Sequence, residues 1–260
     1  MADPVIPSTK AGNNVGTLPV LYKDPRPLDF NNFGKHGLKR DASALFACAN
    51  SLPLTAGEFA IAHMFYPIIF VGDPIMPVCV LGFDNGENLF ITPGGKWAED
   101  TYVPAYVRRY PFVLAEIPGD DRRYLCADYA AEVITDKNPD LPFFTPDGKV
   151  TETVNQALEF CRRFQEDVLM TQAFCTELNS HGLLKPVELR FTLPNGTQQG
   201  AGSIISIEPA TFDALPDSVF LDFRKRGLLP LIYMAIVSLN NWGQLNARRE
   251  RRATQAANSR

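Results

Sequence analysis

The sequence predicts an α+β fold, in which antiparallel strands pack with a long central amphipathic helix and a helical C-terminal part. Short β-branched and aromatic runs are separated by turn sequences such as Asp84-Asn85-Gly86, a pattern that favours hairpins. Apolar residues recur at near-helical spacing over residues 151–179. Strand and helix patterns do not alternate regularly, which argues against a doubly wound parallel sheet.

Composition narrows the class of protein. The chain has 260 residues, of which 45% are hydrophobic and 21% charged, as in globular proteins with a large core. A net charge of −4 argues against a general nucleic-acid binder, which is usually basic. We see neither a signal-peptide pattern nor a membrane span, so we expect a cytoplasmic protein. The five cysteines form no C-x-x-C motif, and we expect reduced thiols rather than disulfides.

Three regions are expected along the chain: a flexible arm over residues 1–17, a single domain over residues 18–245, and a basic tail over residues 246–260. No linker-like change of composition interrupts the central region. The tail contains five arginines and one glutamate. A frayed, solvated helix end is the simplest interpretation of such a run, and binding to an acidic partner, a nucleic acid or a membrane surface is the alternative.

The N-terminal elements begin with predicted strands over residues 18–22 and 41–49. Thr55 and Glu58 then form a T-x-x-E capping box, in which each side chain satisfies a free backbone N–H of a first helical turn. A helix is therefore predicted from this point, and it must end before Pro67.

Short runs rich in β-branched and aromatic residues follow, each bounded by Gly, Pro, Asn or Asp. A short helix is expected among them at residues 102–109. The predicted strands are residues 68–71, 78–83, 88–92, 112–117 and 124–128.

The C-terminal half starts with the long helix over residues 151–179, for which Gly182 is a natural C-cap. Residues 187–193 and 202–207 are a predicted hairpin around Pro194-Asn195-Gly196. The remaining helices are predicted over residues 211–215, 217–226 and 228–247.

One segment carries a family resemblance. Residues 97–112 read W-x(4)-Y-x-P-x(3)-R-R-Y-P-F, a combination that is unlikely to arise by chance. Together with Glu58, Tyr66-Pro67-Ile68 and Asn88-Leu89-Phe90, this segment resembles the bacterial SapC family. The resemblance covers essentially the whole of residues 18–245.

The resemblance implies a setting rather than a reaction. The SapC family is named for an association with a bacterial surface layer. Its members are often encoded beside TonB-dependent receptors and tryptophan-halogenase-like proteins, so the resemblance implies a protein partner from such a system. It supplies no catalytic residues that could be transferred to this chain.

The candidate ligand-binding residues are Trp97, Tyr102, Arg108, Arg109 and Tyr110. Arginine stacks on aromatic rings and binds a carboxylate or phosphate through two parallel hydrogen bonds. Such a cluster suits a small anionic or sugar-like ligand. Neighbouring arginines point apart, so we expect one of the two to serve a ligand directly. The structural alternative is that the aromatic rings pack in the core while the arginines bridge two elements.

Catalytic motifs are missing from the sequence, so the catalytic residues are unknown. His36, His63 and His181 lack metal-ligand spacing, and we expect neither a metal nor another cofactor. We therefore expect a non-catalytic protein that binds a small molecule or a partner, in an accessory or regulatory role in envelope nutrient uptake. The alternatives are an enzyme acting on a sugar or amino-acid derivative, and a surface-layer or transport component.

Overall fold

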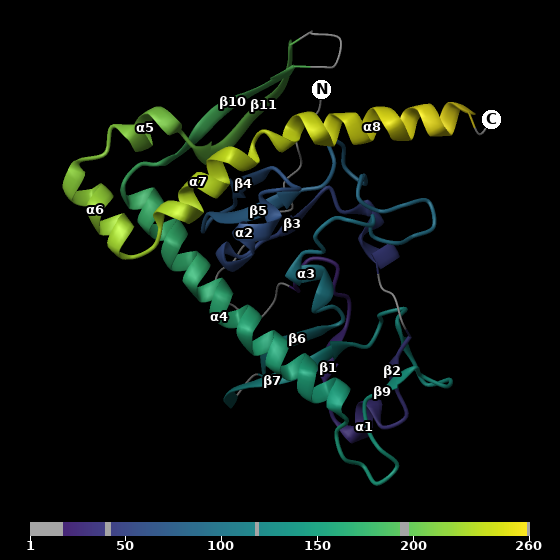
Figure 1. Cartoon of the computed structure of the whole chain (residues 1–260). Helices are drawn as coiled ribbons and strands as arrows, with labels where there is room; N and C mark the ends of the chain where they lie inside the picture. The colour runs from purple at the N-terminus through teal and green to yellow at the C-terminus, as the bar shows by residue number, and fades with distance from the viewer. Residues whose placement is uncertain (1–17, 40–42, 118–119, 193–197, 259–260) are drawn as a thin grey trace.

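Antiparallel sheets and helices build this chain, which confirms the predicted α+β fold (Figure 1). The computed structural model describes residues 18–39, 43–117, 120–192 and 198–258. The predicted flexible arm, residues 1–17, lies outside the described residues.

The largest sheet has five strands in the order β10-β11-β4-β5-β3, and all of its pairs are antiparallel. Its β10–β11 hairpin is the one predicted from the sequence, although the turn at residues 193–197 lies outside the described part. The strands are β3 (Ser51–Pro53), β4 (Ile68–Val71), β5 (Met76–Val80), β10 (Leu184–Thr192) and β11 (Gln198–Ile207).

Two three-stranded sheets complete the β-structure, in the orders β1-β7-β6 and β8-β2-β9. The first contains the strand pair predicted over residues 112–117 and 124–128. The strands are β1 (Pro25–Pro27), β2 (Gly37–Leu38), β6 (Phe112–Ile117), β7 (Asp120–Asp128), β8 (Ile134–Thr135) and β9 (Leu141–Pro142).

The longest helix, α4, spans Glu152–Ser180, and Gly182 follows it with a φ of 65°, as the C-cap prediction requires. The remaining α-helices are α1 (Phe30–Phe33), α2 (Phe59–Ala62), α3 (Ala105–Arg108), α5 (Pro209–Asp213), α6 (Asp217–Lys225), α7 (Leu229–Ser238) and α8 (Asn241–Asn258). Two 3-10 helices precede α2, namely η1 (Ser43–Cys48) and η2 (Ala56–Glu58).

Helix α4 joins two hydrophobic clusters. Near its start, Cys161 packs in a small cluster with Phe33 and Phe143. Further along, Phe164 and Leu178 belong to the large core that collects residues from most of the chain. Figure 1 shows α4 running from the sheet that contains β6 to the neighbourhood of α6 and α7. The predicted single domain over residues 18–245 stays a prediction that limited proteolysis would test.

Three predicted strands are wrong. Residues 18–22 form a turn, in which Leu21 has a φ of 72° and the Tyr22 amide donates to the carbonyl of Pro19. Within residues 41–49, the described part is the 3-10 helix η1. Residues 88–92 form turns, because the buried side chain of Asn88 bonds backbone groups that a strand would need.

The side chain of Asn88 makes two hydrogen bonds to the backbone. Its amide nitrogen donates to the carbonyl of Phe46 at 2.9 Å, and its side-chain oxygen accepts from the N–H of Phe90 at 2.9 Å. An asparagine can offer the backbone an alternative to a β-ladder, and here the tertiary contact selects that alternative.

The predicted last helix, residues 228–247, is divided into α7 and α8. Polar side chains at the corner bind the segment around Pro67. Ser238 accepts a hydrogen bond from the N–H of Ile68 at 2.9 Å, and Asn241 donates to the carbonyls of His63 at 2.7 Å and Tyr66 at 3.1 Å. These hydrogen bonds fix the position of the break between α7 and α8, which the helical periodicity of the sequence does not predict.

The basic tail is helical, and part of it contacts the protein while residues 253–258 are exposed, as expected for a solvated helix end. Helix α8 continues to Asn258. Arg248 lies over the ring of Phe90 at 4.3 Å, and Arg252 donates to the carbonyl of Ile91 at 2.6 Å. Stacking on aromatic rings therefore holds part of the tail against the protein.

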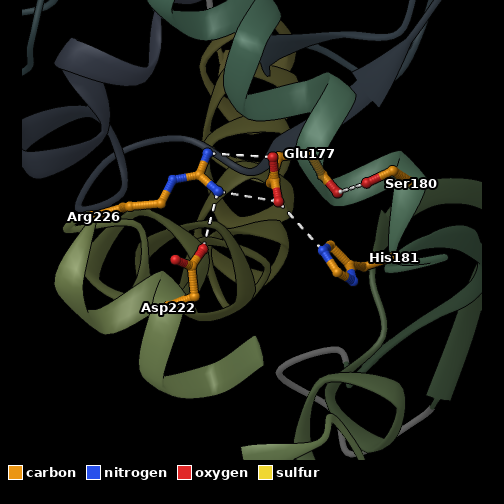
Figure 2. A network of polar contacts seen from close by, with 5 residues as sticks. All are labelled: Glu177, Ser180, His181, Asp222 and Arg226. Atoms are coloured by element: carbon orange, nitrogen blue, oxygen red, sulfur yellow. Dashed lines mark hydrogen bonds and ion pairs between the residues drawn. The ribbon is translucent and has the colours of Figure 1, made fainter. Parts of the chain in front are cut away.

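A surface network ties α6 to the end of α4 (Figure 2). The Arg226 guanidinium lies 3.1 Å from the Glu177 carboxylate and 3.1 Å from the Asp222 carboxylate, and His181 lies 3.2 Å from Glu177. Hydrogen bonding from Arg226 lowers the pKa of Glu177. The groups are partly exposed, so solvent screening keeps the contribution of this network to stability small.

Asp128 anchors the N-terminal part of the described chain. Its side chain is fully buried and accepts from the backbone N–H groups of Lys23 at 3.0 Å, Asp24 at 2.7 Å and Ala130 at 3.3 Å. The hydroxyl of Tyr110 donates to it at 3.3 Å. A buried carboxylate with four donors is well compensated, and any change of its acceptor atoms leaves donors unpaired.

We predict that Asp128→Asn lowers the free energy of unfolding by about 2–3 kcal/mol, because the new NH₂ group faces donors instead of accepting from them. Urea denaturation measures the change. The control is Asp213→Asn, which makes the same change of charge at an exposed position and should stay within about 0.5 kcal/mol of the parent. Equal effects of the two substitutions would contradict the role assigned to Asp128.

Candidate functional site

Glu58 positions the predicted ligand-binding segment. The capping box is confirmed: one carboxylate oxygen of Glu58 accepts from the N–H of Thr55 at 2.9 Å. The other oxygen accepts from the Tyr102 hydroxyl at 2.9 Å and from the N–H of Ala105 at 2.7 Å. Glu58 is only 5% exposed, so these donors replace the water that its charge has lost. The same carboxylate thus fixes both the start of η2 and the start of α3.

The two neighbouring arginines leave α3 in different directions, as expected for adjacent side chains. Arg108 is exposed and donates to the Tyr102 hydroxyl at 2.9 Å, while its guanidinium lies 5.2 Å from the ring of Phe160. Arg109 is half-buried, and its guanidinium lies 4.5 Å from the ring of Phe164. Phe160 and Phe164 are one turn apart on α4, so each ring receives one arginine.

Aromatic rings surround Arg109. Its guanidinium carbon lies 4.4 Å from the centre of the Tyr106 ring, 4.5 Å from that of Phe164 and 5.5 Å from that of Tyr22. Its Nε atom is buried and has no hydrogen-bond partner in the protein. Among the described residues, no carboxylate forms an ion pair with this guanidinium. Its positive charge is therefore stabilised by ring faces and lacks an anionic partner.

Arg109 lines a cavity of about 370 Å³. The walls come from the segment before β1, from β3, β4, β5 and β6, and from α4. Most wall residues are aliphatic, among them Leu52, Leu54, Val78 and Val113. A mainly apolar cavity with a small number of polar groups is the usual form of a small-molecule site.

Burial sets the electrostatics next to the cavity. It raises the pKa values of the Tyr22 and Tyr106 phenols, and the positive charge of Arg109 opposes this rise. Both phenols therefore remain neutral at neutral pH. Their hydroxyl groups are already engaged, because Tyr22 donates to the carbonyl of Phe112 at 2.7 Å and Tyr106 to that of Val20 at 2.7 Å. The guanidinium is thus the main donor at this end of the cavity.

Trp97 lies away from the walls of this cavity and is buried in the core. Its indole N–H donates to the Tyr66 hydroxyl at 3.2 Å, and its ring stacks on Phe90 with centres 6.4 Å apart. The Tyr66 hydroxyl in turn donates to the backbone carbonyl of Tyr102. These contacts hold the Trp97 loop against the segment that leads into α3.

Tyr110 is also a core residue. It packs edge-to-face on Tyr22 at 5.2 Å and on Phe46 at 5.7 Å, and it donates to Asp128. Burial raises the pKa of its phenol, and the charge of Asp128 adds to that rise.

Of the five predicted ligand-binding residues, Arg109 alone is among the residues that line the cavity. Trp97, Tyr102 and Tyr110 pack or hydrogen-bond within the protein, and Arg108 lies on the exposed side of α3. A ligand-binding role for these four stays a prediction.

Sequence reasoning missed the rings around Arg109. Tyr106 lies three residues before Arg109, so helical spacing was a usable signal. Tyr22 and Phe164 come from distant segments, and no local pattern indicates their approach.

Residues 28–245 match the family model of SapC. The chain belongs to the SapC family. No curated protein and no solved structure matches it. The family assignment confirms the resemblance seen in residues 97–112, whereas the surface-layer and TonB-receptor associations stay predictions.

Two further observations on this SapC-family protein concern membrane spans and metal sites. None of the helices in the described part combines the length and apolar composition that crossing a membrane requires. Within the same part of the chain, no three His, Cys, Asp or Glu side chains gather closely enough to hold a metal ion. His63 and His181 instead contact Phe59 and Glu177 of their own helical segments.

All five cysteines are free, and Cys48 is the exposed one. Burial raises the pKa of Cys126 to about 11, that of Cys161 to about 11 despite the nearby charge of Arg109, and that of Cys175 to about 12. A thiol with a pKa near 11 is ionised in about one molecule in a thousand at pH 8, and the thiolate is the reactive form.

We predict that one thiol of the native protein reacts rapidly with Ellman's reagent at pH 8, and that all five react in denaturant. Cys48→Ser should remove the rapid phase and leave four thiols after denaturation. Two or more rapidly reacting native thiols in the parent would contradict the burial described for the other four.

Proposed function

We propose that this SapC-family protein binds a small organic anion in the cavity, and that Arg109 pairs with the anionic group of this ligand. The observation that carries the proposal is a half-buried guanidinium that lines an apolar cavity without any carboxylate partner among the described residues. Placing a charge away from water without a counter-charge is unfavourable, and an anionic ligand would supply that counter-charge.

The lining supports binding rather than catalysis. The described lining residues include no His, Cys, Asp or Glu, which are the side chains that most often transfer protons or attack substrates. The polar groups besides Arg109 are hydroxyls such as Ser51 and the amides of Gln165 and Gln172. These groups can orient a ligand. The hydroxyl of Thr55, which also lines the cavity, donates to Glu58, but that carboxylate is already engaged by backbone N–H groups and by the Tyr102 hydroxyl.

Family membership extends the proposal to a physiological setting. We place the protein in the cytoplasm, in an accessory or regulatory role in nutrient uptake across the envelope. Its partner there would belong to a TonB-dependent receptor system or to the tryptophan-halogenase-like proteins. Ligand binding would then report the supply of the transported compound.

The test uses 2-naphthoate as the probe, because it combines one carboxylate with an apolar body of suitable size. We predict that Arg109→Met weakens 2-naphthoate binding about 10- to 100-fold, since hydrogen bonds to a charged group contribute about 1.5–3 kcal/mol. Isothermal titration calorimetry measures this change. Arg109→Lys should also weaken binding, because lysine cannot reproduce the planar fork of donors.

Two controls separate binding from packing. Arg108→Met removes the neighbouring guanidinium from the exposed side of α3 and should leave binding unchanged. Arg109→Met should not lower the free energy of unfolding, because it removes an unpaired charge and keeps an apolar side chain in contact with the rings. Destabilisation by Arg109→Met with unchanged probe binding would instead show that Arg109 has a packing role.

A further inference from the structure

We infer that the ligand is an aliphatic monocarboxylate of medium chain length, whose acid group pairs with Arg109 while its chain lies along the apolar walls. This inference rests on the proposed function and narrows it to one class of compound. Three properties of the cavity carry it: its single charge, the chemistry of its walls and its volume.

The charge of the cavity favours a monoanion. Arg109 is the only charged side chain among the described lining residues. One carboxylate neutralises it, whereas a phosphate monoester dianion would leave a negative charge uncompensated in an apolar space. The planar guanidinium also matches the two oxygens of a carboxylate through parallel hydrogen bonds.

The other polar groups of the lining are few, and part of them are already engaged. The hydroxyl of Tyr106 donates to the carbonyl of Val20, and that of Thr55 donates to Glu58 at 3.0 Å. A sugar presents many hydroxyl groups, each of which needs a partner when it leaves water. The lining therefore fits one polar head group, and it argues against the sugar-like ligand that the sequence left open.

The walls fit a flexible hydrocarbon chain. Leu54, Val78, Val113, Leu114 and Val168 offer branched aliphatic side chains from four different segments. Aromatic rings lie mainly at the Arg109 end, where they contact the guanidinium. Aliphatic walls gain from burying methylene groups and impose no flat shape on the ligand.

The volume sets the chain length. An engineered apolar cavity of about 150 Å³ holds one benzene molecule, so a cavity of about 370 Å³ holds roughly 15 non-hydrogen atoms on the same scale. Carboxylic acids of about 10 to 14 carbons have that size.

The experiment compares four probes by calorimetry, each below its solubility limit and, for the ionic probes, below the micelle-forming concentration. We expect dodecanoate to bind at least about 10-fold more tightly than dodecan-1-ol, whose head group is uncharged. Dodecanoate should also bind at least about 10-fold more tightly than dodecyl phosphate, whose dianionic head group carries one negative charge more than Arg109 can neutralise. Octanoate should also bind at least about 10-fold more weakly than dodecanoate, because it buries four fewer methylene groups. Dodecanol or dodecyl phosphate binding as tightly as dodecanoate would overturn the inference.

A second variant tests the position of the chain. Val168 lines the cavity, whereas its neighbour Leu169 is 53% exposed and is not among the lining residues. Val168→Trp should shorten the available space and reverse the preference, so that octanoate binds more tightly than dodecanoate. Leu169→Trp adds the same side chain outside the cavity and should leave the preference unchanged. An unchanged preference in Val168→Trp would also count against the inference.

The outcomes for 2-naphthoate separate this inference from the proposed function. If 2-naphthoate binds in a manner that depends on Arg109 while dodecanoate does not bind, the cavity is an anion site and the ligand class is wrong. If neither probe binds, the proposed function fails as well.

Discussion

The buried carboxylate of Glu58 is the constraint on which the candidate site depends. It is 5% exposed, and its charge is tolerated because the groups around it donate hydrogen bonds from two separate segments. Thr55 contributes from the start of η2, while Tyr102 and Ala105 contribute from the start of α3. Since α3 leads directly to Arg109, the acid that caps one helix also determines where the cation of the cavity lies.

Asp128 plays a matching role for the segment that carries Tyr22. Its bonds to the backbone of Lys23 and Asp24 hold the segment that carries Tyr22, one of the rings around Arg109. Both buried acids are thus satisfied by backbone N–H groups and by tyrosine hydroxyls rather than by arginines. Because the acids are satisfied without the arginines, the guanidinium of Arg109 has no carboxylate partner among the described residues.

Arginines stack on aromatic rings in other parts of the molecule as well. Arg108 and Arg109 stack on Phe160 and Phe164 of α4, and Arg248 stacks on Phe90. Burial lowers the pKa of Arg248, and the nearby charge of Arg251 adds to this lowering. Aromatic rings stabilise such cations only in part, so a guanidinium held by rings alone is less well compensated than one paired with a carboxylate.

The sequence by itself determined the local elements whose signals lie within a few residues. The capping box at Thr55 and Glu58, the strand pair over residues 112–117 and 124–128, and the long helix with Gly182 at its end all follow from short-range hydrogen bonding and periodicity. The motif over residues 97–112 also identified the family. In each case the physical cause acts between neighbours along the chain.

The tertiary structure alone decided which partners meet across long separations. The segment around Asn88 does not form a strand, because the Asn88 amide donates to the carbonyl of Phe46. The last predicted helix breaks where Asn241 donates to the carbonyls near Pro67. Arg109 was predictable as a candidate, but its place on a cavity and its lack of a carboxylate partner among the described residues depend on how α4 and the segment before β1 pack around it. A buried polar or charged side chain bonds to whichever partner the folded chain places next to it. No local sequence pattern predicts which distant residues lie close together in space.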